Sequence, residues 1–93
     1  MSGLNFTSIL WDRDDDPDGN VQHIARHNLT MEDVEAVFDN PTGTDTSRSS
    51  GRPVVFGDTG NGRYIMVTYE MIDASTIYPI TAFDVARPKR KRK

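Results

Sequence analysis

The sequence predicts a single small α+β domain, in which two helices cover one face of a small antiparallel sheet made of a short N-terminal strand and a three-stranded meander. An apolar N-terminal run is followed by two segments with helical spacing of apolar residues, and then by three segments rich in β-branched and aromatic residues. The 93 residues suffice for one core, because a chain of this size buries somewhat over ~60% of its unfolded surface. We therefore expect residues 1–86 to form one domain.

Residues 6–11, Phe-Thr-Ser-Ile-Leu-Trp, predict a short first strand at an edge of the sheet, because β-branched and aromatic residues favour extended structure. The next segment, residues 12–19, contains five aspartates, a proline and a glycine. Such a composition does not form regular structure, so it predicts a solvated loop.

A first helix is expected to begin at Val21, with Asn20 as its N-terminal cap. His23 and His27 would lie one turn apart on it. Asn28 tolerates the left-handed conformation that ends many helices, and we expect the helix to stop there. The inward face of this helix is expected to comprise Val21, Ile24 and Ala25.

The second helix has the clearest local signal in the chain. Thr30 is placed to cap it, and Asp33 stands at the third helical position, where its carboxylate completes a variant capping box. We expect a helix over residues 31–38, ended by Pro41 because proline disfavours helical geometry in the residue before it. Its inward face would be Met31, Val34, Val37 and Phe38.

Residues 42–51 contain only Ser, Thr, Gly, Asp and Arg, so this segment can bury no apolar side chain, and we expect a mobile loop. Three strands should follow it. The first two, at 52–56 and 63–72, flank a glycine-rich stretch that is typical of a hairpin turn. The last strand is expected at 76–85, and because Pro79 has no backbone donor, that strand should lie at an edge there or carry a bulge.

Basic residues are concentrated at the C-terminal end of the chain. Residues 1–86 hold five arginines and all fourteen acidic residues, a net charge of −9. This body would repel a phosphate backbone, whereas residues 87–93 would form a disordered basic tail that attracts RNA or an acidic partner. The tail also resembles a nuclear-localisation signal or a plain solubilising segment. The candidate RNA-binding residues are Arg87, Lys89, Arg90, Lys91, Arg92 and Lys93.

Composition excludes several classes of protein and site. The chain has no cysteine, so it can form neither a disulfide framework nor a thiolate nucleophile nor a cysteine-based zinc site. No apolar run approaches the ~18 residues of a membrane-spanning helix. The first residues also lack the charge and apolar pattern of a secretory signal, so we expect a cytoplasmic protein.

Patterns that could indicate a cofactor or metal are incomplete. His23 and His27 have the spacing that lets two imidazoles meet one metal ion, but no third ligand is placed beside them. The glycines of residues 57–62 are followed by a strand and lack the lysine of a phosphate-binding loop, so they are better explained as a hairpin turn. We expect no cofactor and no metal.

One calcium-like pattern stays open as a weaker alternative. Asp14, Asp16 and Asp18 match the opening of a calcium-binding loop. Ala25 stands at the twelfth position, where such loops carry a bidentate glutamate. Otherwise these aspartates form a solvated turn whose charge favours the N-terminus of the helix that follows.

Short motifs also occur in a distinctive order along the chain. They are Trp11-Asp12, Arg26-His27, Thr30 with Glu32-Asp33, Val37-Phe38 with Pro41, Gly62-Arg63, Tyr69 and Ile80-Thr81-Ala82. In this order the chain resembles the BrnT-type toxins, which are small RelE-like ribonucleases of bacterial type II toxin–antitoxin pairs. The resemblance implies a RelE-like fold, cleavage of RNA without a metal, and neutralisation by a small DNA-binding antitoxin partner.

The resemblance also implies candidate catalytic residues. His27 with Arg26 matches the Lys-His pair of the family, and Arg63 matches its Gly-Arg motif. His27 would move a proton near neutral pH, while the two arginines would form charge-assisted bonds to phosphate. In the alternative interpretation His27 helps to cap its helix, and the arginines pair with nearby carboxylates.

The chain departs from the family where the chemistry would occur. Asn28 replaces a glycine, Phe83-Asp84 stand where the family carries an arginine pair, and a proline with a Lys/Arg run replaces its basic C-terminal helix. We therefore expect a BrnT-like protein whose RNA cleavage is weak or lost. The alternative is a non-catalytic protein-binding module on the same fold, and exposed strand edges would also allow a homodimer.

Overall fold

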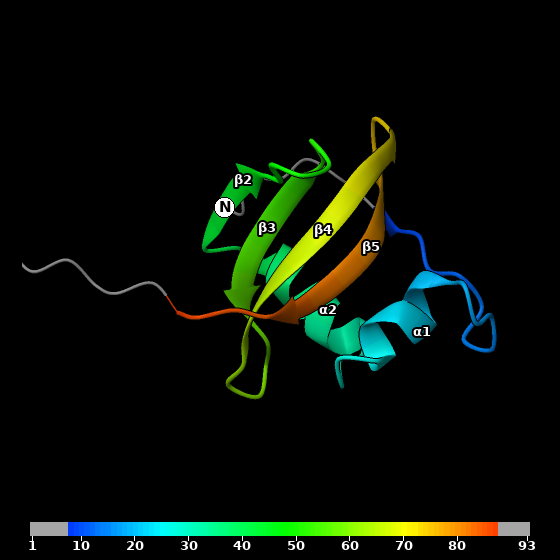
Figure 1. Cartoon of the computed structure of the whole chain (residues 1–93), viewed down its shortest axis with the longest axis horizontal. Coiled ribbons are helices and arrows are strands. Elements are labelled where there is room, and N and C mark those ends of the chain that lie inside the picture. Colours follow the sequence, from blue (N-terminus) through cyan, green and yellow to red (C-terminus); the bar gives the residue numbers. More distant parts are fainter. Residues whose placement is uncertain (1–7, 88–93) are drawn as a thin grey trace, which may run out of the picture.

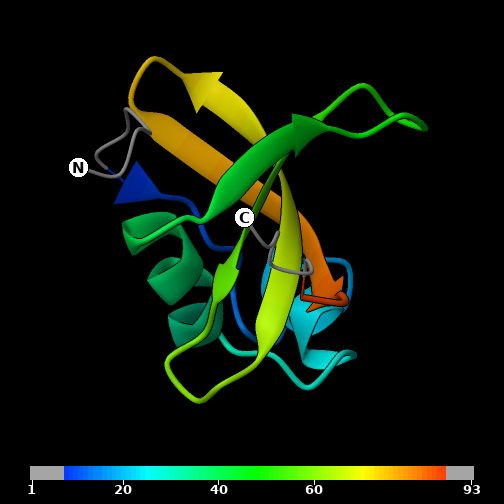
Figure 2. The ribbon, with the colours of Figure 1, turned by 90° about the vertical axis from the view of Figure 1, so that its left-hand side faces the viewer.

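In the computed structural model, which describes residues 8–87, five strands form one mixed sheet and two helices pack on one of its faces (Figure 1). The strands lie in the order β1-β5-β4-β3-β2. Figure 2 shows α2 lying along one side of the twisted sheet. The predicted α+β class is thus confirmed. The elements are β1 (Ser8–Ile9), α1 (Asn20–Ala25), α2 (Met31–Asp39), β2 (Gly43–Thr46), β3 (Pro53–Asp58), β4 (Tyr64–Asp73) and β5 (Thr76–Asp84).

The first strand ends at Ile9, before the predicted residues Leu10 and Trp11, and its direction relative to β5 differs from the prediction. Within the described residues β1 lies at the edge of the sheet, as predicted, and pairs with β5 through Ser8↔Thr76 and Ile9↔Ile77. This pairing is parallel, so the sheet is mixed and not purely antiparallel. An alternating apolar pattern shows which side chains face the core, but it carries no information on strand direction.

The segment expected to be an irregular loop, residues 42–51, contains the edge strand β2. Its four residues pair antiparallel with β3, from Gly43↔Phe56 to Thr46↔Pro53. The prediction of no regular structure was wrong for these four residues, because backbone pairing needs no apolar side chain and threonine favours strands. Ser47 to Gly51 then form the turn into β3, with Gly51 at a φ of 73°.

The predicted meander of β3, β4 and β5 is confirmed. The turn between β3 and β4 is closed by the Thr59 N–H, which donates to the Arg63 carbonyl at 2.8 Å. Along β4 and β5 the register shifts between Thr68 and Tyr69, and Tyr69 pairs with Pro79. Pro79 therefore lies at a bulge, which accommodates its missing donor as expected.

Helix α1 begins differently from the prediction. Gly19 is the N-terminal cap and contributes no side-chain bond, while Asn20 is the first helical residue and is 1% exposed. The Asn20 N–H instead donates to the Asp12 carboxylate at 2.9 Å, and its side-chain amide donates to the carbonyls of Leu10 and Pro79. A Cβ at Gly19 would lie 2.7 Å from the Asp12 Cβ, which is too close. The close approach of Asp12 to the start of α1 therefore requires glycine at this position.

The capping box of α2 is confirmed in full. The Asp33 N–H donates to the Thr30 hydroxyl at 3.2 Å, and the Thr30 N–H donates to the Asp33 carboxylate at 3.0 Å. The inward faces of both helices match the prediction except at Ala25, which is exposed, and at Met31 and Val21, which are half-buried. The remaining predicted inward residues, Ile24, Val34, Val37 and Phe38, are fully buried.

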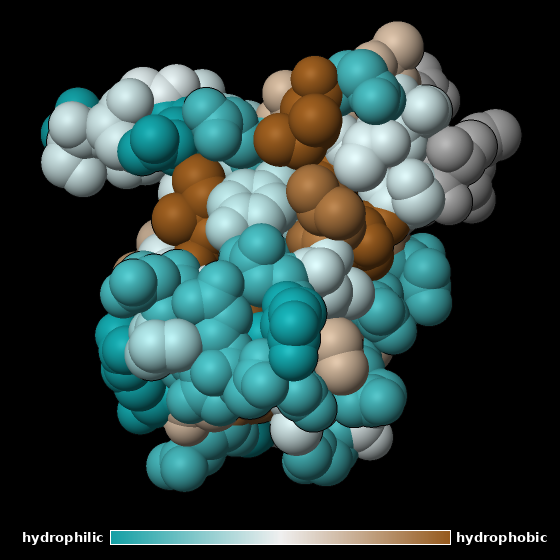
Figure 3. Space-filling model, turned by 90° about the vertical axis from the view of Figure 1, so that its right-hand side faces the viewer, coloured by the Kyte–Doolittle hydropathy of each residue, from teal (hydrophilic) through white to brown (hydrophobic). Residues whose placement is uncertain are grey.

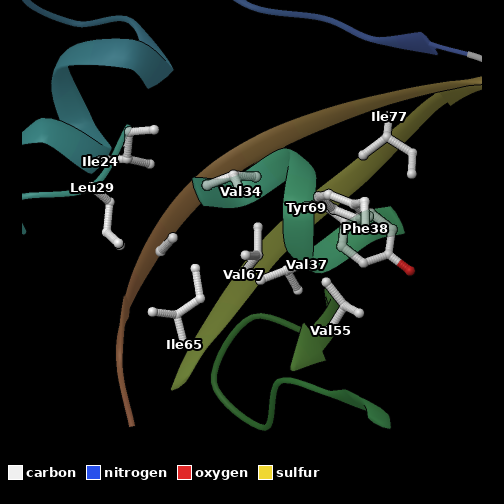
Figure 4. Close-up of a cluster of buried hydrophobic side chains, with 11 residues drawn as sticks. Ile24, Leu29, Val34, Val37, Phe38, Val55, Ile65, Val67, Tyr69 and Ile77 are labelled. Atoms are coloured by element: carbon white, nitrogen blue, oxygen red, sulfur yellow. The ribbon is translucent and has the colours of Figure 1, made fainter. Parts of the chain in front are cut away.

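The hydrophobic core lies between the helices and the sheet (Figure 4). The Phe38 and Tyr69 rings meet edge to face with centroids 5.2 Å apart, and Ile9 and Trp11 pack against the cluster. Neither helix within residues 8–87 has the length and apolar character needed to cross a membrane. The core residues are Ile24, Leu29, Val34, Val37, Phe38, Val55, Ile65, Val67, Tyr69, Ile77 and Ala82.

Candidate functional site

The C-terminal end of α1 positions the candidate catalytic histidine. The Asn28 N–H donates to the Ala25 carbonyl at 2.9 Å and the Leu29 N–H donates to the Ile24 carbonyl at 3.1 Å, as in a Schellman motif. Asn28 has a φ of 61°, so its predicted left-handed conformation is confirmed, but α1 itself ends at Ala25, earlier than expected, and His27 lies in the turn after it. This geometry leaves the carbonyl groups of His27 and Asn28 without a partner inside the helix. The His27 side chain is exposed beside them.

Those carbonyl groups are bound by Arg63. Its guanidinium donates to the His27 carbonyl at 2.9 Å and to the Asn28 carbonyl at 2.6 Å. The same group forms a bidentate pair with Asp84, with distances of 2.9 Å from Nε and 2.6 Å from Nη2. Because a guanidinium has five N–H donors, these four bonds leave little capacity for another anion.

The ion pair makes the ionised form of both partners still more favourable. The hydrogen bond from Arg63 lowers the pKa of Asp84, and the positive charge of Arg63 lowers it further. In turn the bond to Asp84 raises the pKa of Arg63. Both groups therefore stay ionised at neutral pH, and their charges largely cancel.

The His27 imidazole lies beside this pair but is not held by it. Its ring centroid is 5.9 Å from that of Phe83, with the planes tilted by 53°. Within residues 8–87 no group is hydrogen-bonded to the imidazole. The imidazole is thus exposed to solvent, and no hydrogen bond within residues 8–87 fixes its orientation.

Arg26 is directed to a different part of the fold. Its guanidinium donates to the Pro17 carbonyl at 3.0 Å, in the loop before α1. It shares no hydrogen-bonding partner with Arg63. The three predicted catalytic residues therefore divide into His27 beside Arg63 and, separately, Arg26.

This arrangement limits the chemistry that the His27 region can support. Cleavage of RNA by its own 2′-hydroxyl needs a group that moves protons and cations that stabilise the developing negative charge. His27 could serve as the first. The cation beside it, Arg63, is already neutralised by Asp84, and a phosphate would have to displace at least one of its four bonds.

Among the candidate RNA-binding residues, only Arg87 lies within the described part of the chain; Lys89, Arg90, Lys91, Arg92 and Lys93 lie outside it. Arg87 pairs with Asp58 at 2.5 Å. Its guanidinium also lies 5.1 Å from the centroid of the Tyr64 ring, a distance suited to a cation–π contact. Arg87 thus packs against the hairpin of β3 and β4.

No metal centre is formed by the residues that the structure describes. Across residues 8–87 no three His, Cys, Asp or Glu side chains come together in a way that could hold a metal ion. In the aspartate-rich loop, the Asp16 carboxylate accepts a bond from the Asp18 N–H at 3.0 Å, which closes a local turn. Arg13 pairs with Asp15 at 3.2 Å, so part of the loop charge is balanced there.

The sequence did not predict a partly buried polar network beside α1. The Tyr78 hydroxyl donates to the Asp12 carboxylate at 2.5 Å, and that carboxylate also accepts from the Asn20 N–H. The bond to Asp12 raises the pKa of Tyr78 to about 12, and the same bond lowers the pKa of Asp12. Nothing local in the sequence links residues so far apart along the chain.

Three large hydrophobic side chains in the described part of the chain are strongly exposed: Leu10, Met71 and Ile72, at 45%, 45% and 52%. Leu10 follows β1 on one side of β5, whereas Met71 and Ile72 lie near the end of β4 on the other side. Figure 3 shows apolar areas among hydrophilic ones on the side of the molecule that it faces. The sequence indicates the exposure of Met71 and Ile72, because they stand next to the turn that follows β4.

Comparison of the chain with models of protein families, with curated proteins and with solved structures found no match. The geometry of the described residues is therefore the main guide to function.

Proposed function

We propose that this chain is a BrnT-like member of a two-protein pair, whose main activity is to bind an antitoxin-like partner and in which RNA cleavage is weak or lost. Under this proposal the pair acts in the cytoplasm. The main support for this proposal is the bonding of Arg63, whose guanidinium donates hydrogen bonds to Asp84 and to two backbone carbonyls.

Loss of a free cation has a large effect on the rate of such a reaction. Removing one group that stabilises the developing charge typically costs ~10² or more in rate. Arg63 holds the end of α1 against the end of β5, which is a structural role. Asp84 takes the place of one residue of the family's arginine pair, so it replaces a positive charge by a negative one beside His27.

Other motif residues also have structural roles in this fold, which supports a shared scaffold. Asp12 binds the first N–H of α1 and the Tyr78 hydroxyl. Thr30 and Asp33 form the capping box of α2. The resemblance therefore rests on residues that build the domain, and such residues are compatible with a protein that binds without cleaving.

The net charge of the folded domain favours a protein partner over RNA. Residues 8–87 contain fourteen acidic residues and six arginines, a net charge of −8 with neutral histidines. A surface of this sign repels nucleic acid but attracts a basic protein. A partner that binds DNA needs Lys and Arg to contact phosphate, so the antitoxin of such a pair has the complementary charge.

Expression of the chain alone in bacteria tests the proposal. Growth and total RNA would be followed after induction, with His27→Ala and Arg63→Ala as controls. We expect little arrest of growth and intact RNA, with no difference between the wild type and His27→Ala. Rapid arrest with RNA cleavage that His27→Ala abolishes would show an active ribonuclease and overturn the proposal.

The identity of the partner is tested separately. The first step is to look for a short ribbon-helix-helix gene beside this one; its product would be co-expressed with the chain and the complex isolated by size exclusion. A stable complex supports the pair. Its absence, together with intact RNA, would favour the second candidate, a non-catalytic binding module on the same fold with an unrelated partner.

A further inference from the structure

We propose that the Asp58 carboxylate, the Tyr64 ring and the Gly62 carbonyl form a recognition site for an arginine of a partner protein, and that Arg87 of the chain itself occupies this site in the absence of the partner. We call these three groups the guanidinium site. This inference rests on the proposed function, because it names a place at which the chain holds its basic partner. None of the three residues belongs to the His27 region described above.

The contacts of Arg87 show what the site binds. Its Nη1 lies 2.5 Å from the Asp58 carboxylate, and its Nη2 donates to the Gly62 carbonyl at 3.4 Å. The centre of the guanidinium lies 5.1 Å from the centroid of the Tyr64 ring. A flat, permanently charged guanidinium pairs with carboxylates and stacks on aromatic faces. The structure thus contains a bound arginine side chain, which the chain itself supplies.

Strand pairing places the groups of the site on one surface. Asp58 and Tyr64 stand directly opposite each other in the pairing of β3 with β4, so their side chains share one face of the sheet. Ile65, the next residue of β4, belongs to the core, so this face is the one turned away from the helices. Figure 1 shows the chain after β5 crossing the end of β4, which brings Arg87 over the Tyr64 ring.

Contacts that do not involve Arg87 hold the site in shape. The Tyr64 and Thr42 hydroxyls are hydrogen-bonded at 2.9 Å. The Tyr64 ring also stacks on Phe56, with centroids 6.4 Å apart and planes tilted by 14°. Asp58 is the last residue of β3 and is positioned by its pairing with β4. Since the site is preformed, exchange of one arginine for another requires little reordering of the fold.

Arg87 is held loosely enough to be exchanged. The side chains of Arg87 and Asp58 are 54% and 46% exposed, and exposed ion pairs contribute little to stability. Within residues 8–87 the last backbone bond to the sheet is that of the Val85 N–H to the Tyr64 carbonyl. Arg63 differs in both respects, because its side chain is 27% exposed and its guanidinium donates four bonds. Arg63 therefore has a structural role, whereas Arg87 occupies an exchangeable site.

Charge and shape select an arginine of a protein as the occupant. The net charge of −8 on residues 8–87 attracts a basic partner. An aromatic ring alone would also suit a nucleic acid base, but Asp58 would repel the phosphate backbone beside it. A lysine ammonium lacks the flat shape that stacks on a ring while pairing with a carboxylate. An arginine satisfies the carboxylate, the ring and the carbonyl together.

The test uses the full chain and a single guanidinium as the probe, N-acetyl-arginine amide. The controls are N-acetyl-lysine amide and N-acetyl-citrulline amide, whose side chain has the shape of arginine but no charge. Binding would be measured from backbone amide shifts in NMR spectra. We expect saturable shifts with the arginine amide alone, centred on Asp58, Gly62 and Tyr64. Because one exposed contact is weak, the affinity should lie in the millimolar range.

Removal of the internal arginine should strengthen binding of the probe. Arg87→Ala takes away the usual occupant of the site, so the apparent affinity should rise about two- to fivefold. A second variant also replaces Arg90 and Arg92 by alanine, so that no arginine after the last strand can compete. Arg52→Ala is the matched control, because Arg52 is an exposed arginine that approaches Glu70 instead. Its affinity for the probe should equal that of the wild type.

Loss of the acceptor groups should weaken binding. In the Arg87→Ala background, Asp58→Asn should reduce the affinity about threefold or more, because it removes the charge that pairs with the probe. Asp45→Asn is the matched control, since Asp45 is an exposed aspartate on the neighbouring β2. Tyr64→Leu removes the aromatic face and should also weaken binding. Thermal unfolding would verify that each variant remains folded, and Asp58→Asn decides the matter if Tyr64→Leu does not.

Three results would overturn the inference. The first is the lack of saturable shifts at the guanidinium site in the variant without Arg87, Arg90 and Arg92. The second is equal binding of the lysine or citrulline amide, which would show that the site does not select a guanidinium. The third is unchanged affinity in Asp58→Asn.

The outcome can be separated from that of the proposed function. If the arginine amide fails to bind while RNA stays intact and the partner complex forms, only the guanidinium site is wrong. If the chain cleaves RNA through His27, the proposed function fails whatever the probe does.

Discussion

Arg63 and Asp84 form a bidentate ion pair between the residue before β4 and the last residue of β5, with distances of 2.9 Å and 2.6 Å. Arg63 also binds the carbonyls of His27 and Asn28. One side chain thus fastens the turn between the helices to the ends of two strands. The pair also explains why the cation nearest to His27 is already neutralised.

This pair makes stability depend on pH in the acidic range. Because Arg63 lowers the pKa of Asp84, the folded state favours the carboxylate more strongly than the unfolded state, where the pKa is about 3.9. The stabilisation is fully present above the unfolded pKa and is lost as pH falls through the lower, folded pKa. In thermal unfolding between pH 6 and about 2, Asp84→Asn should therefore lose less stability than the wild type.

The control for this experiment is Asp15→Asn. Asp15 pairs with Arg13, but both side chains are largely exposed, at 68% and 85%, so the contribution of this ion pair should be small. The pH profile of this variant should follow that of the wild type. An unchanged profile for Asp84→Asn as well would show that the ion pair does not stabilise the fold.

The hydroxyl of Tyr78 should make stability depend on pH in the alkaline range as well. Its bond to Asp12 raises its pKa to about 12, so the neutral phenol is favoured by folding. This stabilisation is present below the unfolded pKa of about 10 and is lost as pH rises through about 12. In an absorbance titration of the tyrosines, we expect Tyr78→Phe to remove the step near pH 12.

The same variant should also be less stable at neutral pH. Tyr78→Phe removes one hydrogen bond to an ionised carboxylate, and such bonds contribute about 1.5–3 kcal/mol to the free energy of unfolding. Urea denaturation at pH 7 would measure this loss. If Tyr78→Phe were as stable as the wild type and kept the late titration step, the bond to Asp12 would not form in solution.

The sequence predicted local features well and long-range contacts poorly, for a physical reason. Thr30 and Asp33 are three residues apart, so their capping box is visible in the chain itself. Asn28 likewise signals its own left-handed conformation. Along the chain, two strands lie between Arg63 and Asp84, although their side chains are in contact. The resemblance indicated each residue separately but not that they form a pair.

Edge strands show the same limit. Because β2 contains Thr44, Asp45 and Thr46 and no large apolar residue, its pattern could not be distinguished from that of a loop. Its formation depends on the neighbouring β3, which supplies backbone partners. The position of Leu10 beside β5 could not be predicted either, since it depends on backbone pairing with Ile77, far along the chain.

The capping box of α2 allows a direct test of local stabilisation. Thr30→Ala removes the hydroxyl that accepts from the Asp33 N–H, and should reduce the free energy of unfolding by about 1 kcal/mol. Thr30→Ser keeps the hydroxyl and should restore most of this loss. Urea denaturation of the two variants would measure the difference, and equal stabilities would mean that the cap contributes nothing.

Two glycines near the hairpin of β3 and β4 test the packing of α2 on the sheet. A Cβ at Gly57 would lie 3.0 Å from Val37 Cγ1 and 3.4 Å from Val37 Cα, so in Gly57→Ala the Val37 side chain on α2 must give way by a few tenths of an ångström. We expect a loss of about 1–3 kcal/mol in the free energy of unfolding, as is typical of an overpacked core. Gly60→Ala is the matched control, because a Cβ there meets no atom within 4 Å. Equal stability of the two variants in urea denaturation would show that α2 and β3 are not in close contact at Gly57.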